Sequence, residues 1–250
     1  EYIVFLNTDT TVEKNWLSEL VKKIQSDDRI GACSSQVLYN DHREIINTVG
    51  GFWSIFGIPG SMGEGMLKDT FKNETLTFSP TGCSMIVRAD LYKELGGFDN
   101  DYFLYCEDAD LGWRMWNRNF KVVLATSSVV YHRVTASLKG LGKKTFSEWY
   151  YFYSARNRFT TIMKNARTVD LLWMIPLYFI SHLVLALLFG LKRKTIAMKA
   201  TLKGMMYPVR DWGWIKKRKL YKKTGYANIR MIGLFDTLKT FLTKKEKHFD

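Results

Sequence analysis

The stretch PTGCSMIVRADLYKELGGFDNDYFLYCEDADLGWR, residues 80–114, decides how the rest of this sequence is interpreted. It opens on a turn of small residues, 81–83, and continues into an apolar run typical of a buried strand. A short helical segment follows and ends at a pair of glycines. An aromatic strip then leads to an amphipathic helix, at whose start stand three carboxylates: Glu107, Asp108 and Asp110.

These three acids have two explanations. Carboxylates are common at helix N-termini, because the free N–H groups and the helix dipole favour negative charge there. This explanation accounts for one or two of the three. Burial behind aromatic side chains would raise the proton affinity of a carboxylate and suit it to accept a proton. The crowding therefore favours a catalytic role for Glu107 and Asp108.

Another acid follows an apolar run near the start of the chain. Tyr2–Leu6 is rich in strand-forming residues, and we expect a buried parallel strand there. Ligands collect beyond the carboxyl ends of such strands, so Asp9 lies where a ligand would bind. An aspartate that caps the next helix would explain the same residue. His132 also follows an apolar run, where a lone histidine is most often structural.

The string GGFDNDYFLYCEDADLGWR, residues 96–114, resembles the acceptor-side motif of inverting family 2 glycosyltransferases, especially the bacterial rhamnosyltransferase-like branch. The resemblance extends from about residue 2 to about residue 165. It implies an α/β fold of the GT-A, Rossmann-like type. It also implies transfer of a sugar, with inversion, from a nucleotide diphosphate sugar to the hydroxyl of a glycan or lipid-linked acceptor in cell-envelope polysaccharide synthesis.

The same resemblance assigns roles to individual residues. Asp108 corresponds to the general base, and Glu107 is expected to orient either the base or the acceptor. Gly82 and Cys83 are expected beside the sugar, and Asp110 is grouped with them as a substrate-binding residue.

Two further motifs imply a divalent metal, Mn²⁺ or Mg²⁺. LNTDT, residues 6–10, is similar to the family's Asp-X-Asp metal motif, and YHRVTAS, residues 131–137, is similar to its His-X4-Ser element. The implied ligands are Asp9 and His132. Asn7 stands where stricter versions of the motif have Asp. Members of the family also carry strands before this motif, and the chain starts at Glu1 without Met, so we interpret it as N-terminally truncated.

A long helix is predicted over residues 143–167, and it carries Arg156 next to Asn157. Arginine beside a diphosphate can neutralise the charge of the leaving group, so Arg156 is a candidate substrate contact. A solvated basic helix face explains the residue equally well.

The net charge of +13 is concentrated in one part of the chain. Residues 192–250 carry 17 Lys and Arg against 4 Asp and Glu, so the preceding residues are neutral. A basic tail indicates contact with a polyanion, either a membrane surface or nucleic acid, and a merely solvated basic face is the alternative. The adjoining segment 171–191 has no charged residue and is long enough to cross a bilayer, for which a nucleic-acid binder has no use. A non-enzymatic membrane or nucleic-acid binding module remains the alternative function.

We therefore expect a catalytic domain over residues 1–140 and a helical, membrane-associated region over residues 141–250. The three cysteines have no pairable spacing, which favours a reduced, cytosolic setting. Nucleotide sugars are cytosolic, and the basic tail prefers the same side of the membrane. A single crossing would separate the two, so we expect residues 171–191 to lie in the interface or to re-enter as a hairpin broken near Pro176, at the cytoplasmic face of the cell membrane.

Overall fold

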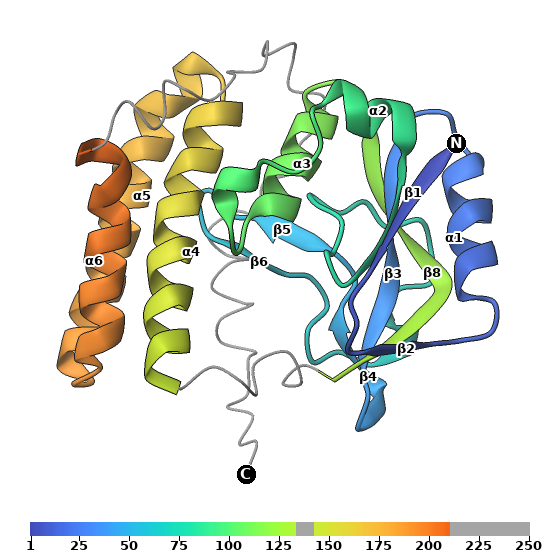
Figure 1. Ribbon diagram of the computed structural model, residues 1–250, viewed down its shortest axis with the longest axis horizontal. Helices are drawn as coiled ribbons and strands as arrows, with labels where there is room; N and C mark the ends of the chain where they lie inside the picture. The colour runs from blue at the N-terminus through green and yellow to red at the C-terminus, as the bar shows by residue number, and fades with distance from the viewer. Residues whose placement is uncertain (134–142, 211–250) are drawn as a thin grey trace.

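The computed structural model describes residues 1–133 and 143–210 of the chain (Figure 1). Its strands are β1 (Tyr2–Leu6), β2 (Thr10–Val12), β3 (Ile30–Tyr39), β4 (His42–Thr48), β5 (Gly51–Trp53), β6 (Pro59–Ser61), β7 (Ser84–Arg88) and β8 (Lys121–His132). Its α-helices are α1 (Trp16–Gln25), α2 (Ala89–Glu94), α3 (Glu107–Trp116), α4 (Lys143–Asn165), α5 (Thr168–Leu191) and α6 (Thr195–Arg210). Ser137 of the predicted metal element and most of the basic tail lie outside the described residues.

Strand β3 is the centre of a six-stranded sheet with the order β1-β7-β3-β8-β2, and β4 also pairs with β3. β8 runs parallel to β3, whereas β7 runs antiparallel to it. β3 is buried from Ile30 to Leu38, as expected for a central strand with both faces covered. The sequence of residues 30–38 also predicts a strand, and the structure confirms it.

Strand β1 differs from the prediction of a buried parallel strand. It pairs antiparallel with β7, with Val4 opposite Ile86, and forms an edge of the described sheet. Val4 and Leu6 are 37% and 40% exposed. The prediction was wrong because an apolar run indicates a strand but carries no information about the direction or number of its partners.

Alternate residues of the central strands pack into two layers. Cys33 and Val123 pack against α1, whereas their neighbours Ala32 and Val122 pack against α2 and α3. This is the alternation that a strand imposes on successive side chains. Figure 1 shows the result, with α1 on one side of the sheet and α2 and α3 on the other. The sheet is therefore covered by helices on both faces.

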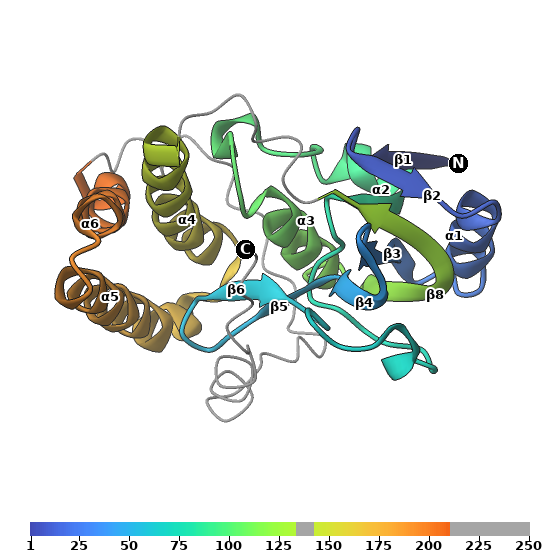
Figure 2. The ribbon, with the colours of Figure 1, turned by 90° about the horizontal axis from the view of Figure 1, so that it is seen from below.

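Helices α4, α5 and α6 lie beside α3 as a separate helical layer (Figures 1 and 2). The long helix predicted from residue 143 is confirmed as α4. One buried cluster joins the two parts of the molecule, with Trp53 and Trp113 from the sheet part and Phe159 and Tyr178 from the helices. The division into domains near residue 140 stays a prediction. Helix α4, which follows this boundary, packs directly against α3, which precedes it.

Helix α5 buries one stripe of residues and exposes the rest. The buried stripe repeats every fourth residue: Asp170, Met174, Tyr178, His182 and Ala186. The other faces expose large apolar residues, among them Leu172, Ile180, Leu183, Leu187 and Leu191. In the part of the chain that the structure describes, α5 is the one helix long and apolar enough to cross a membrane, by length and composition.

Of the two arrangements expected for residues 171–191, the hairpin broken near Pro176 is wrong, because α5 continues through this proline as a single helix, and the position in the interface stays a prediction. Pro176 lies on the exposed side of α5. The carbonyl that loses its N–H partner there is open to the surroundings, so the helix can bend slightly instead of ending.

The four glycines and Pro59 of residues 57–69 predict a mobile loop, but this segment contains regular structure. β6 pairs antiparallel with β5, and a short 3-10 turn spans Lys68–Thr70. Gly57 has a φ of +68°, and a Cβ there would lie 2.8 Å from the side chain of Ile162 in α4. Glycine is thus required for a tight turn that approaches the helical layer.

Candidate active site

Glu107 and Asp108 are the first two residues of α3, and they follow an irregular loop of residues 99–106, here called the 99–106 loop. Cys106, at the N-cap, has a φ of +70°, and Phe103 and Tyr105 also have positive φ. Residues other than glycine rarely adopt a positive φ, and those that do are concentrated at functional sites. An uncommon backbone therefore sets the position of the two carboxylates.

Backbone N–H groups hold the carboxylate of Asp108. Ala109 N donates to Oδ1 at 2.7 Å, and Gly82 N donates to Oδ2 at 3.4 Å. Burial raises the pKa of Asp108, and these hydrogen bonds partly offset the rise. Among the described residues no cation pairs with Asp108. A carboxylate in this setting has the raised proton affinity that suits a general base.

Glu107 shares this environment. Burial raises the pKa of Glu107 to about 7, and the negative charge of Asp108 adds to the rise. Its Oε2 atom is buried and has no hydrogen-bond partner in the described part of the chain. Neighbouring acids of this kind titrate as a pair, so a proton taken up by one affects the other.

The turn of residues 81–83 lies against Asp108. Thr81 N donates to Ser34 Oγ at 3.0 Å, which fixes the turn to the central strand β3. Gly82 leaves open space beside the carboxylate, since a Cβ there would lie 3.9 Å from Asp108 Oδ2. Cys83 is buried, and burial raises the pKa of its thiol to about 12, with a smaller contribution from the charge of Asp9. The thiol is therefore protonated and unsuited to act as a nucleophile.

Asp9 and His132 meet at the end of β8. Thr10, the first residue of β2, pairs with His132, and His132 Nε2 lies 3.3 Å from Asp9 Oδ1. The other ring nitrogen, Nδ1, lies 3.1 Å from Asn47 Oδ1. If Nδ1 donates to Asn47, Nε2 directs its lone pair toward Asp9, and a cation between the two would suit both.

This pair fits a divalent ion. Mg²⁺ binds its ligands at about 2.1 Å in octahedral geometry, so adjacent ligands lie about 3 Å apart, close to the separation of 3.3 Å between Asp9 Oδ1 and His132 Nε2. A carboxylate with an imidazole suits Mn²⁺ at least as well. Within residues 1–133 and 143–210, no group of three or more His, Cys, Asp or Glu is placed to hold a metal ion. The described residues would therefore supply two ligands, Asp9 and His132.

Asp110 has a different environment from the one predicted for a substrate-binding residue. It is fully buried, with Arg114 Nη2 at 2.7 Å and Lys164 Nζ at 3.0 Å. Tyr102 and Asn165 also donate hydrogen bonds to it. The prediction did not allow for the helix period, which turns Asp110 about 200° from Asp108 and toward α4. Asp110 therefore ties α3 to the helical layer.

Arg156 is likewise directed into the protein and not toward a diphosphate. It is 8% exposed, and its Nη2 donates to the backbone carbonyls of Asp101 at 2.7 Å and Tyr102 at 3.0 Å. Its Nε donates to Asn157 Oδ1 at 2.9 Å. The predicted substrate contact is corrected here, because the guanidinium holds the 99–106 loop instead.

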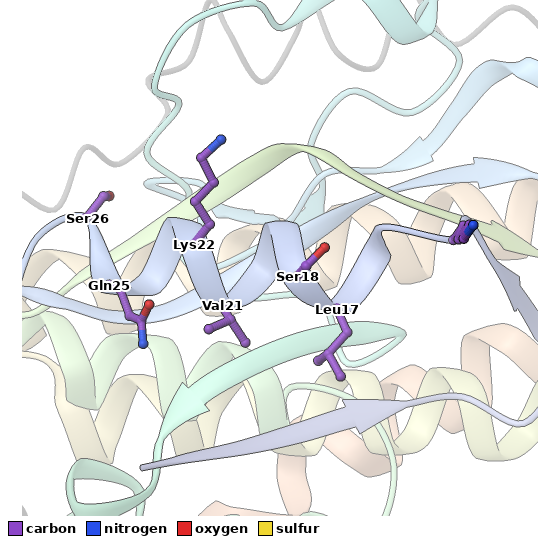
Figure 3. A pocket seen from close by; sticks show the side chains of 7 residues that line it. Leu17, Ser18, Val21, Lys22, Gln25 and Ser26 are labelled. Carbon is purple, nitrogen blue, oxygen red and sulfur yellow. The ribbon is translucent and has the colours of Figure 1, made fainter.

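A shallow depression of about 670 Å³ lies on the outer face of α1 (Figure 3). It is lined by Lys14, Leu17, Ser18, Val21, Lys22, Gln25 and Ser26. These residues include no carboxylate, histidine or cysteine, and none belongs to the site described above. This depression therefore has no part in the candidate chemistry.

Comparison with known families decides the assignment. Residues 2–212 match the family described as "Glycosyl transferase family group 2". The chain belongs to this family. The mixed α/β architecture together with the family match confirms the predicted fold class and the resemblance on which it was based.

Two relatives carry related names. The chain is 30% identical over 126 residues to "Rhamnosyltransferase WbbL" of Escherichia coli (strain K12), covering 46% of this chain and 46% of the relative. It is 38% identical over 52 residues to "N-acetylglucosaminyl-diphospho-decaprenol L-rhamnosyltransferase" of Mycobacterium tuberculosis, covering 21% of this chain and 17% of the relative. The family 2 chain thus spans less than half the length of the curated relatives it matches.

A solved structure is also similar, "Crystal structure of GalNAc-T7 with UDP, GalNAc and Mn2+". The sequence identity is 17% and the TM-score 0.47, with 65% of this chain and 31% of that chain covered.

Two residues with a place in this site were missed in the sequence. Asn47, which lies against His132, and Asn157, which contacts the 99–106 loop, are single amides far along the chain from their partners. The Arg156 and Asn157 pair was noted as a motif, but nothing in its composition indicates backbone carbonyls as its targets.

Proposed function

We propose that this family 2 chain carries the catalytic groups of a metal-dependent inverting glycosyltransferase. One observation supports the proposal most strongly. Within a single turn, Gly82 contacts the carboxylate of Asp108, and the next residue, Cys83, accepts a hydrogen bond from Asn7 in the segment that leads to Asp9. A proton acceptor and a candidate metal pair therefore flank one short turn, as a reaction between an acceptor hydroxyl and a nucleotide diphosphate sugar would require.

In this proposal Asp108 is the general base. The acceptor hydroxyl attacks the anomeric carbon of the donor while Asp108 accepts its proton. The bond between that carbon and the diphosphate oxygen breaks, and its electron pair leaves with the diphosphate. A single displacement of this kind inverts the anomeric configuration. Glu107 orients Asp108 or the acceptor, and the open space at Gly82 admits the sugar.

Asp9 and His132 would hold the divalent ion, Mn²⁺ or Mg²⁺, in the same proposal. When bound, the ion supplies positive charge to the departing diphosphate. Asn47 fixes the ring of His132, as a second group behind a metal-binding histidine commonly does.

The names of the relatives suggest the substrates. Both are rhamnosyltransferases, and one name specifies a diphospho-decaprenol acceptor. We therefore propose transfer of a rhamnosyl or other hexosyl group to a glycan or lipid-linked acceptor in cell-envelope polysaccharide synthesis. The alternative, a non-enzymatic membrane or nucleic-acid binding module, is not favoured by membership of a transferase family.

We further propose that α5 attaches the protein to the cytoplasmic face of the membrane without crossing it. Its exposed faces are apolar, and Lys192, Arg193 and Lys194 follow directly and are exposed. Anionic lipid attracts such residues at about 1 kcal/mol each near the surface. At its middle, Ser181 Oγ donates to the carbonyl of Phe56 at 3.3 Å, in the loop between β5 and β6. A crossing helix would carry the non-helical backbone of this loop into the bilayer, which is costly.

Labelling tests this arrangement. A cysteine placed at Lys194 in sealed, right-side-out cells should react only after the cells are opened. Reaction from outside intact cells would contradict attachment at the cytoplasmic face.

The activity itself is tested by incubating the intact protein with Mn²⁺ and a panel of nucleotide diphosphate sugars, including the rhamnosyl donor, and a polyprenyl diphosphate sugar acceptor. We expect donor-dependent transfer that is lost on chelation of the metal. Absence of transfer and of donor binding across the panel would contradict the proposal.

A further inference from the structure

The 99–106 loop has a backbone that its own sequence does not favour. Phe103, Tyr105 and Cys106 have φ values of +59°, +64° and +70°, although none is glycine. Such conformations persist when surrounding contacts over-determine them. Because Glu107 follows Cys106 directly, whatever holds this loop also fixes the direction in which Glu107 and Asp108 leave it.

The contacts come from one amide on α4. Asn157 Nδ2 lies 2.9 Å from the carbonyl oxygen of Tyr102, 2.6 Å from that of Leu104 and 2.9 Å from that of Tyr105. The side chain of Asn157 is fully buried. The two N–H bonds of this amide are therefore shared among three carbonyls of the loop.

Arg156 fixes the orientation of this amide. Its Nε donates to Asn157 Oδ1 at 2.9 Å, so the Nδ2 group must face the loop. Its Nη2 binds one further carbonyl, that of Asp101, and shares the carbonyl of Tyr102 with Asn157. Without these donors, the half-buried carbonyls of Leu104 and Tyr105 would lose their contact with Asn157, and the loop would relax toward ordinary φ values.

We propose that Asn157, oriented by Arg156, is a positioning residue for the carboxylate pair of Glu107 and Asp108. It touches neither carboxylate and acts through the loop backbone. Helix α4 is then part of the catalytic apparatus and not only a support for the membrane-facing α5. This inference rests on the proposed transfer reaction.

A positioning role predicts a signature that a purely structural role does not. The pKa of Glu107 is raised to about 7 mainly by burial. If the loop relaxes, water reaches the pair and the pKa of each carboxyl falls back toward its ordinary value. The acid limb of the pH–rate profile, where the base becomes protonated, should then move to lower pH.

The test compares two variants of the intact protein. Asn157→Leu keeps a similar volume and removes the amide, and Asn157→Ser keeps one short donor. Thr160→Val is the matched control, because Thr160 is buried on the same helix and its hydroxyl binds only within α4, to the carbonyl of Arg156. We expect Asn157→Leu to lower kcat by roughly 10², the loss typical of a misplacement near 1 Å, with KM for the donor within about twofold. Asn157→Ser should be intermediate, and Thr160→Val near normal.

The outcomes are separable. An acid limb moved to lower pH in both Asn157 variants, with kcat corrected for the folded fraction, supports positioning. Equal losses in Thr160→Val and Asn157→Leu, or an unmoved pH profile, overturn it. If the unaltered protein transfers no sugar, the proposed function is overturned together with the positioning role. If transfer survives Asn157→Leu, only the positioning role is overturned.

Discussion

Asp108 and Asp110 lie two positions apart on α3, and their surroundings are opposite. Arg114 and Lys164 enclose Asp110 with two cations. In the described residues, Asp108 has backbone N–H groups as its partners and no cation. Buried charge must be compensated, and where compensation is incomplete the pKa rises, as it does for Asp108. Asp108 and Asp110 are both aspartates and lie within one helical turn. The counter-ions, and not the residue type or its burial, therefore decide which of them holds the structure together and which can accept a proton.

The largest expected effect comes from removing the uncompensated acid. Asp108→Asn should lower kcat by about 10² to 10⁴, the usual contribution of a general base. It should leave the free energy of unfolding unchanged or slightly higher, since a buried charge without a cation is removed. Turnover with a saturating donor, together with urea unfolding, would measure both. A variant that turns over normally would end the assignment of Asp108 as base.

Removing the compensated acid should do the reverse. Asp110→Asn removes the buried anion that Arg114 and Lys164 share, although Lys164 keeps Asp99 at 2.9 Å, and removing one partner of a buried ion pair typically costs about 3–5 kcal/mol of stability. Donor affinity of the fraction that stays folded should be unchanged. Urea unfolding and donor titration test this. An Asp110→Asn protein of normal stability that has lost donor binding would restore Asp110 as a substrate contact.

The pH dependence of stability offers a third test. The pKa of Glu107 is raised from its ordinary value to about 7, so the folded state binds a proton that the unfolded state has released. The stabilisation is fully present below about pH 4.5 and is lost as pH rises through about 7, by at most about 3 kcal/mol for this group. Glu107→Gln should flatten the fall in stability across that window. Unfolding curves from pH 5 to 8 that match for both proteins would show that Glu107 is not buried in this way.

Asp9 extends the comparison of Asp108 with Asp110, because its carboxylate lies beside the imidazole of His132. Asp9→Asn and His132→Ala should each weaken Mn²⁺ and nucleotide diphosphate binding together. Asn47→Ala, which only frees the His132 ring, should weaken them by about 10-fold to 100-fold. Calorimetric titration with Mn²⁺ and UDP would show it. Unchanged affinity in both ligand variants would move the metal site elsewhere.

Some of this could be predicted from the sequence, for physical reasons. The helix start at Glu107 follows from local patterning, and residues 30–38 are predicted as a strand, although their central place in the sheet is not. The pairing of β1 was not predictable, because the apolar residues of an edge strand look like those of a buried one. A hairpin broken near Pro176 was one of two expected arrangements, but the effect of this proline depends on which side of α5 faces the surroundings.

The site shows the same limit. Asp9 and His132 were named together from motifs, and the structure brings their side chains within 3.3 Å. Asp110 and Arg156 were grouped with substrate because composition does not say which way a side chain points. Their partners, Lys164 and the carbonyl of Asp101, are more than fifty residues away in sequence. Long-range partners of this kind are set by tertiary packing and leave no local pattern.

The pairing of β2 with β8 has a consequence for biosynthesis. Thr10 pairs with His132, so β2 has no sheet partner in the described fold until β8 has been made. At typical rates of translation the interval is on the order of ten seconds. Throughout it Asp9 lacks its histidine, and β2 is an open strand edge that other chains could bind. The candidate metal pair is therefore completed late in translation. A nascent chain that stalls before residue 132 cannot bind metal through this pair.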